Sequence, residues 1–179
     1  MRTVTAQEFA DILKEENIDP KELQRLAVEK LVKSGKKVAT AESCTGGLIS
    51  KRITEVSGSS GVFDCGVCSY ANFIKHKLLG VSEATLDTVG AVSPETAQQM
   101  AAGVRQLAEA DFGISTTGIA GPTGGTPEKP VGLVYISASC ESETTVIKAL
   151  LGDAQPPTRE NIRKIASDIA LWLLIKQIS

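Results

Sequence analysis

The octet Thr-Ala-Glu-Ser-Cys-Thr-Gly-Gly at residues 40–47 lies between two apolar segments of different pattern. Val38–Ala41 reads as a short buried strand, and Leu48–Ile53 has the apolar spacing of a helix. We therefore predict a strand, a tight turn and a helix from about Gly46 to Glu55. Paired glycines let the backbone approach a ligand closely, and the first turn of a helix presents unpaired N–H groups to an anion.

The turn carries one acid, two hydroxyls and one thiol, namely Glu42, Ser43, Thr45 and Cys44. Short polar side chains before a helix often cap its first N–H groups. The same side chains at a strand-to-helix turn are also suited to chemistry, because such a turn holds them rigidly. The local pattern therefore leaves two readings open, a helix cap and a chemical site.

The arrangement of predicted elements indicates the fold class. Further strands are predicted at Val62–Ser69, Phe112–Thr117, Gly132–Ser139 and Thr144–Leu150. Strands and helices alternate early in the chain and strands cluster late, which is typical of an α/β fold. We predict one domain with a mixed β-sheet covered by helices on both faces, a three-layer αβα arrangement. The capping-box pattern Thr5–Glu8 starts an added N-terminal helix within residues 1–19.

Composition is that of an ordinary soluble globular domain. The 179 residues fit one domain with a buried core, and a net charge of −2 gives no overall attraction to nucleic acid or to a membrane surface. No apolar run is as long as a membrane span, and the first residues contain no apolar signal core. We expect a cytoplasmic protein that binds neither nucleic acid nor a membrane.

The four cysteines and one histidine do not show the spacing of metal ligands. Cys65 and Cys68 fall in a predicted strand, where positions i and i+3 point to opposite faces. This favours reduced structural cysteines over a zinc or redox pair. His76 follows Lys75 on a predicted helix and is expected at the surface. We predict no metal site and no cofactor.

Together with later motifs, the octet resembles the nicotinamide-nucleotide amidase family, the C-terminal domain family of competence-damage-inducible protein A, CinA. The later motifs are Tyr70-Ala71-Asn72, Lys75 and Gly118-Ile119-Ala120-Gly121-Pro122, in the family's order. The resemblance runs from about Leu23 to about Lys176, and we take residues 20–179 as an amidase domain of this type. It implies hydrolysis of nicotinamide mononucleotide to nicotinate mononucleotide and ammonia, without a cofactor. It also implies a homodimer or higher homo-oligomer.

By this resemblance, Ser43, Tyr70 and Lys75 match the family's catalytic serine, tyrosine and lysine. Amide hydrolysis needs a nucleophile, a base and donors for the oxyanion, and a serine activated by lysine is one solution. Backbone N–H groups near Cys44–Gly47 are the expected oxyanion donors. Cys44 is the rival nucleophile, but no histidine lies beside it to activate the thiol. As a base, Lys75 has to be partly buried and within hydrogen-bond reach of Ser43 or Tyr70.

The resemblance also implies a substrate pocket drawn from several segments. Its expected residues are Glu42, Thr45, Gly46, Gly47, Asn72, Gly118, Ala120, Gly121, Arg159 and Arg163. The segment Gly118–Pro130 lacks the Gly-Lys-Ser/Thr of a Walker loop, and a simple chain reversal is its other reading. Arg159 and Arg163 share a helix face, which suits either a phosphate or solvent. Ala154–Thr158 before them is a departure from the family pattern.

A second function stays open at this point. The same pocket would suit a non-catalytic nucleotide-binding or regulatory module, in which Ser43 only caps a helix. In both cases the expected partner is a small-molecule nucleotide, and release of ammonia distinguishes the two.

Overall fold

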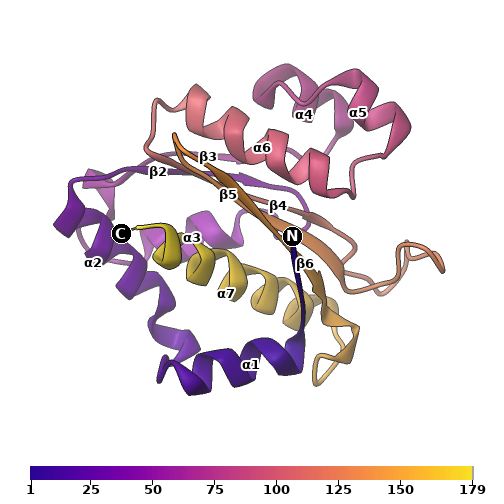
Figure 1. Ribbon diagram of the computed structural model, residues 1–179, viewed down its shortest axis with the longest axis horizontal. Helices are drawn as coiled ribbons and strands as arrows, with labels where there is room; N and C mark the ends of the chain where they lie inside the picture. Colours follow the sequence, from indigo (N-terminus) through magenta and orange to yellow (C-terminus); the bar gives the residue numbers. More distant parts are fainter. Residues whose placement is uncertain (179) are drawn as a thin grey trace.

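The computed structural model describes residues 1–178 and has three layers, with a six-stranded mixed sheet in the middle (Figure 1). The strands are β1 Arg2–Thr5, β2 Val38–Glu42, β3 Phe63–Cys68, β4 Phe112–Gly118, β5 Leu133–Ser139 and β6 Thr144–Leu150. Their order across the sheet is β1-β6-β5-β4-β2-β3. β5 runs antiparallel to both of its neighbours, and the other pairs are parallel. The predicted α/β class and mixed sheet are confirmed.

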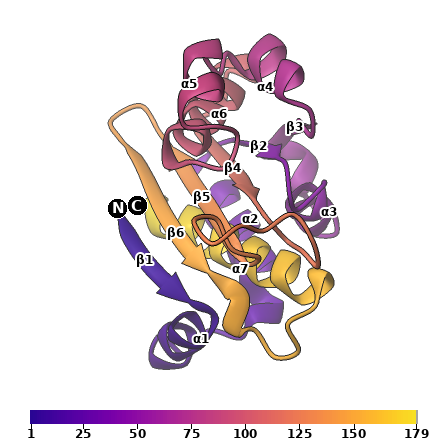
Figure 2. The same cartoon turned by 90° about the vertical axis from the view of Figure 1, so that its right-hand side faces the viewer.

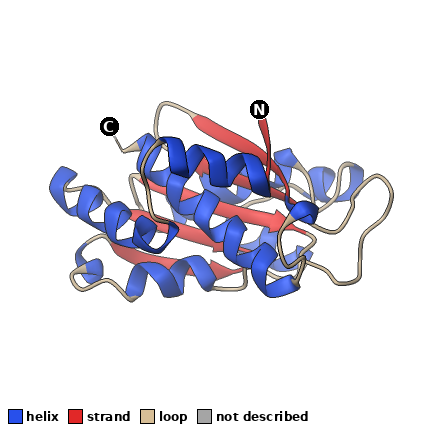
Figure 3. Ribbon diagram, turned by 90° about the horizontal axis from the view of Figure 1, so that it is seen from below, coloured by secondary structure: helices blue, strands red, loops and turns tan. Residues whose placement is uncertain are grey.

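Helices cover both faces of the sheet, as predicted (Figures 1 and 3). On one face lie α4 Asn72–Leu79, α5 Glu83–Thr88 and α6 Pro94–Leu107, and on the other lie α1 Ala6–Glu15, α2 Leu23–Ser34, α3 Leu48–Thr54 and α7 Arg159–Gln177. Short 3-10 turns occur at Pro20–Glu22, Ser59–Gly61 and Leu151–Asp153. No helix in the described residues is both long and apolar enough to cross a bilayer.

Helix boundaries follow the capping signals of the sequence. Thr5 and Glu8 form the predicted capping box at the start of α1. Ser93 caps α6 through the backbone N–H of Thr96, with Pro94 in the first helical position. These local interactions satisfy N–H groups that a helix start would otherwise leave without partners.

The N-terminal segment is more than the added helix that the sequence predicts. Residues Arg2–Thr5 form β1, a sixth strand that pairs in parallel with β6 at the edge of the sheet (Figure 2). The strand is four residues long and only Val4 is buried, so it lacks the apolar alternation that marks a strand in sequence. The carboxylate of Asp153 accepts hydrogen bonds from the backbone N–H groups of Ala6 and Gln7, which ties α1 to the domain.

The parallel part of the sheet brings separated segments to one edge. Glu42 at the end of β2 is in register with Cys68 of β3 and with Thr116 of β4. The carboxyl ends of parallel strands meet on one side of a sheet, where open α/β folds commonly bind ligands. The residues that follow each of these strands therefore come together around Ser43.

Candidate active site

Ser43 is the first residue after β2 and is half-buried. Its backbone N–H donates to the carbonyl of Thr116 at 3.0 Å, which fixes it against β4. The backbone N–H of Gly46 closes the turn onto the Ser43 carbonyl at 3.1 Å. Gly46 and Gly47 have φ of 59° and 91°, a left-handed region that favours glycine. The two glycines of the octet therefore make this turn possible.

Ser43 does not cap the following helix. Helix α3 begins at Leu48, and its N-cap position is Gly47, which has no side chain. The first N–H groups of the helix bind the carboxylate of Glu42 instead. The capping reading of Ser43 is therefore wrong, and its hydroxyl is left for other contacts.

Glu42 was expected to bind substrate, and its environment corrects that expectation. Its side chain is fully buried, and the carboxylate accepts hydrogen bonds from Gly47, Ile49 and Ser50. A buried carboxylate with these partners has no free face to offer a ligand. The sequence signal for this role is an acid placed just before a helix start, where negative charge is stabilised.

Lys75 lies in the second turn of α4, and only 1% of it is exposed. Its amine nitrogen lies 3.2 Å from Ser43 Oγ, 2.6 Å from the carbonyl oxygen of Ser69 and 3.3 Å from that of Tyr70. The predicted proximity of Lys75 to Ser43 is confirmed. Burial lowers the pKa of Lys75 below its ordinary value of 10.5, because the charged form loses its hydration.

The role of Ser69 was not foreseen. Its carbonyl makes the shortest of the three contacts with the Lys75 amine, and its backbone N–H donates to the carbonyl of Glu42 at 2.9 Å. Ser69 thus ties the lysine to the end of β2. A backbone contact of this kind leaves no mark on the side-chain pattern, so the sequence gives no signal for it.

Tyr70 lies two residues after β3 and is 64% exposed. Its hydroxyl oxygen accepts a hydrogen bond from Arg159 Nη2 at 3.0 Å, and Arg159 Nη1 donates to the carbonyl of Gly121 at 2.7 Å. The side chain of Tyr70 is therefore held by Arg159, whereas the contact of Tyr70 with Lys75 is made by the backbone. Arg159 links the segment after β3 and the glycine-rich segment to α7.

Arg163 makes a second bridge from α7 to the site. Its Nε and Nη2 atoms donate to the carbonyl of Thr45 at 3.2 and 2.5 Å. The Thr45 side chain is fully buried and shares a hydrogen bond of 2.7 Å with the hydroxyl of Thr116. The Thr45 side chain therefore faces the sheet, and the predicted contact of Thr45 with substrate is left to its backbone. The guanidinium of Arg163 supports the turn from outside.

The glycine-rich segment contributes mainly backbone. A Cβ atom at Gly118 would lie 2.5 Å from the carbonyl oxygen of Leu133, so this glycine is needed for the approach of β5. The side chain of Ala120 is buried in the core, and the contact of this residue with substrate stays a prediction. Gly121 has φ of 74° and reaches the site through its carbonyl. Asn72 is exposed at the start of α4, and its contact with substrate stays a prediction.

Cys44, the rival nucleophile, is 5% exposed. Burial raises the pKa of its thiol to about 12, and the charge of Glu42 acts in the same direction. The reactive thiolate is therefore nearly absent at neutral pH. This environment favours Ser43 as the nucleophile.

A basic cavity of about 520 Å³ adjoins the turn. Its lining residues are Leu48, Arg159, Glu160, Arg163 and Lys164. Three of the five carry positive charge, which suits an anionic group. The two arginines predicted to share a face of α7 do so here.

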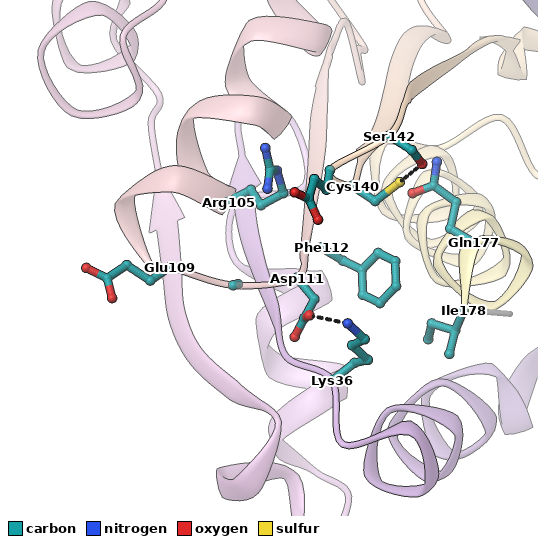
Figure 4. A pocket seen from close by; sticks show the side chains of 11 residues that line it. Lys36, Arg105, Glu109, Asp111, Phe112, Cys140, Ser142, Gln177 and Ile178 are labelled. Atoms are coloured by element: carbon teal, nitrogen blue, oxygen red, sulfur yellow. Dashed lines mark hydrogen bonds and ion pairs between the residues drawn. The ribbon is translucent and has the colours of Figure 1, made fainter.

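A larger cavity, of about 570 Å³, lies at the other end of the strands, near the start of β4 (Figure 4). Its walls include Phe112 and the ion pair of Lys36 with Asp111, whose charged atoms are 2.7 Å apart. Ser43 lies beyond the carboxyl end of β2, so this cavity is remote from the serine–lysine pair. The candidate site is therefore the region around Ser43 and Lys75, and the larger cavity is not part of it. The described residues contain no cluster of three or more His, Cys, Asp or Glu suited to a metal ion.

The fold and the site define an α/β protein in which a half-buried serine contacts a buried lysine at the carboxyl edge of the sheet. The chain belongs to the CinA C-terminal domain family, whose model matches residues 20–178. The expected family is thereby confirmed.

Relatives in sequence and structure agree with this assignment. A competence-damage inducible protein of Thermoanaerobacter sp. (strain X514) is 52% identical over 158 residues, which are 88% of this chain and 38% of that protein. The crystal structure of the competence/damage inducible protein CihA from Agrobacterium tumefaciens is 43% identical, with a TM-score of 0.84 over 88% of this chain and 94% of that one. A CinA superfamily protein from Enterobacter cloacae is 30% identical, with a TM-score of 0.83 over 90% and 94% of the two chains. The chain spans little more than a third of the length of such curated relatives.

Proposed function

We propose that the protein is a serine amidase that hydrolyses nicotinamide mononucleotide to nicotinate mononucleotide and ammonia. The observation that carries this proposal is the contact between the buried amine of Lys75 and the hydroxyl of Ser43, 3.2 Å apart. A nucleophile within hydrogen-bond reach of a base of lowered pKa is the arrangement that acyl transfer requires. The identity of the substrate rests on the family resemblance.

In the first half of the reaction, Ser43 Oγ attacks the carboxamide carbon and neutral Lys75 takes the hydroxyl proton. The tetrahedral intermediate then collapses as the Lys75 ammonium gives a proton to the departing nitrogen. Ammonia leaves and an ester joins Ser43 to the nicotinoyl group. In the second half, Lys75 removes a proton from water, the resulting hydroxide equivalent attacks the ester carbon, and Ser43 recovers its proton as nicotinate mononucleotide departs.

Hydrogen bonds within the turn limit which backbone N–H groups can donate to the oxyanion. The N–H groups of Gly46 and Gly47 already bind the Ser43 carbonyl and the Glu42 carboxylate. We therefore assign the oxyanion to the N–H groups of Cys44 and Thr45, which have no backbone acceptor within residues 1–178. Preorganised backbone donors of this kind stabilise a developing negative charge without reorganisation.

The basic cavity is suited to the phosphate end of the substrate. Arg159, Arg163 and Lys164 all line this cavity, and Arg163 also binds the Thr45 carbonyl in the serine turn. We assign the phosphate of the nucleotide to this cavity and the exposed ring of Tyr70 to the mouth of the site. A homodimer in the cytoplasm stays a prediction.

Incubation with nicotinamide mononucleotide tests the proposal. Ammonia and nicotinate mononucleotide should appear in equal amounts with the wild type, in the presence of a chelator, and neither should appear with Ser43→Ala. Binding of the nucleotide without release of ammonia would contradict the proposal and favour a nucleotide-binding module.

A further inference from the structure

A hydrogen-bond network lies directly behind the serine turn. The carboxylate of Glu42, the residue before Ser43, spans the turn to its far end: Oε2 accepts from the N–H groups of Gly47 and Ile49, each at 3.0 Å. Oε1 accepts from the N–H and the hydroxyl of Ser50 at 2.8 and 2.7 Å. Glu42 thus ties the strand end that precedes Ser43 to the start of α3.

The network continues into the sheet. The Ser50 hydroxyl donates to Glu42 and lies 2.7 Å from the hydroxyl of Thr40, so Thr40 donates to Ser50. Thr40 and Glu42 are both fully buried, and Thr40 belongs to the strand that leads into the turn. Both ends of the turn are therefore tied to the same strand.

Gly66 supplies an independent observation. It lies on the edge strand β3, is exposed, and is the register partner of Thr40. A Cβ atom at this position would lie 2.5 Å from Ser50 Oγ and 3.0 Å from both Thr40 Oγ1 and Cζ of Phe63. Gly66 is not among the residues with positive φ, so its backbone conformation does not require glycine. The absence of a side chain at residue 66 keeps space for the Ser50–Thr40 contact.

We propose that Glu42 is a positioning residue for Ser43, and that Ser50, Thr40 and Gly66 hold its carboxylate in place. The effect of this positioning on turnover rests on the proposed amidase function. An amide in place of the carboxylate would bring its NH2 group against N–H donors of the turn. The turn would then shift, and a displacement of about 1 Å of a reacting group can lower a rate by roughly 100-fold.

Steady-state kinetics with nicotinamide mononucleotide test the effect on catalysis. Glu42→Gln should lower kcat about 100-fold and leave KM within about threefold, because Glu42 touches no substrate. Ser50→Ala and Gly66→Ala should each lower kcat about three- to tenfold, and their double variant should lose little more than either, because both changes remove the same contact. Ser50→Ala and Gly66→Ala still test the proposal if Glu42→Gln does not fold.

Matched controls come from the same elements. Glu55→Gln removes an exposed carboxylate that pairs with Lys51 at the end of α3, and Gly61→Ala adds a methyl group where no atom lies within 4 Å. Both should keep kcat within about twofold of the wild type. A Gly66→Ala variant with wild-type kcat, or a Glu42→Gln variant that changes KM alone, would overturn the proposal.

Amide hydrogen exchange tests the network without substrate. Glu42→Gln should speed the exchange of the Gly47, Ile49 and Ser50 amides, with the change confined to residues 43–54. Unchanged exchange in this segment would overturn the proposal. If the wild type releases no ammonia, the amidase function fails, and exchange still decides whether Glu42 holds the turn.

Discussion

The amine nitrogen of Lys75 lies 3.2 Å from the hydroxyl oxygen of Ser43, although 32 residues separate them in the chain. The contact exists because β2 and β3 are parallel neighbours, so the turn after β2 and helix α4 after β3 start at the same edge of the sheet. Burial of the lysine lowers its pKa, which raises the fraction of neutral amine near pH 7. Geometry and protonation therefore both suit proton transfer from Ser43.

Replacing Lys75 by arginine should nearly abolish turnover. Arginine keeps the positive charge but does not give up a proton at any working pH, so the base is lost. We expect kcat to fall roughly 10²–10⁴-fold in Lys75→Arg. In the wild type, kcat/KM should rise with pH to a plateau, with an apparent pKa below the 10.4 of a lysine in water. An active Lys75→Arg variant would contradict the assignment of Lys75 as the base.

The lowered pKa of Lys75 also predicts a dependence of stability on pH. Between the folded pKa of Lys75 and the unfolded value near 10.4, the unfolded chain binds more protons, so the free energy of unfolding rises with pH. Each pKa unit of depression corresponds to about 1.4 kcal/mol. The difference in Tm between wild type and Lys75→Met should therefore shift in favour of the wild type as pH rises toward 10. A difference in Tm that stays constant from pH 6 to 10 would show that the lysine titrates normally.

Tyr70 and Arg159 should act as a unit. The Tyr70 hydroxyl accepts a hydrogen bond from Arg159, which also donates to the carbonyl of Gly121. Tyr70→Phe and Arg159→Gln should each lower kcat/KM, and the double variant should lose less than the sum of the two losses in free energy, with a coupling of about 0.5–3 kcal/mol. Additive losses in this double-mutant cycle would mean that the hydrogen bond contributes nothing to turnover.

Cys44 should be dispensable and unreactive. Its thiol is buried with a pKa of about 12, whereas Cys68 is exposed on the edge strand. At pH 8, iodoacetamide should label Cys68 before Cys44, as mass spectrometry of tryptic peptides would show. Cys44→Ala should retain activity within about tenfold, the loss arising from the methyl-sized cavity it leaves. Loss of all activity in this variant would indicate that the Cys44 thiol is the nucleophile.

The parts of the fold that sequence could predict are those with a regular pattern. Apolar and β-branched runs bounded by glycine and polar residues placed β2, β4, β5 and β6 close to their observed bounds. Strand β1 was missed, since four residues with one buried side chain carry no period. Its position depends on a long-range pairing with β6, which no local pattern encodes.

The candidate site could also be predicted only in part from the sequence. The proximity of Ser43 and Lys75 was expected from the family resemblance, and the parallel pairing of β2 with β3 accounts for it. The direction of the Glu42 and Thr45 side chains was not foreseen, because polar residues in a turn look alike in sequence whether they face a ligand or the interior. Only the hydrogen-bond partners distinguish the two cases.

The proposed role of Ser43 as the nucleophile of an amidase is tested by ammonia release from nicotinamide mononucleotide, measured for the wild type beside a folded Ser43→Ala variant. We predict turnover by the wild type and a loss of at least about 10³-fold in kcat for Ser43→Ala, with an unchanged circular dichroism spectrum. Near-normal ammonia release by the folded Ser43→Ala variant would contradict the account.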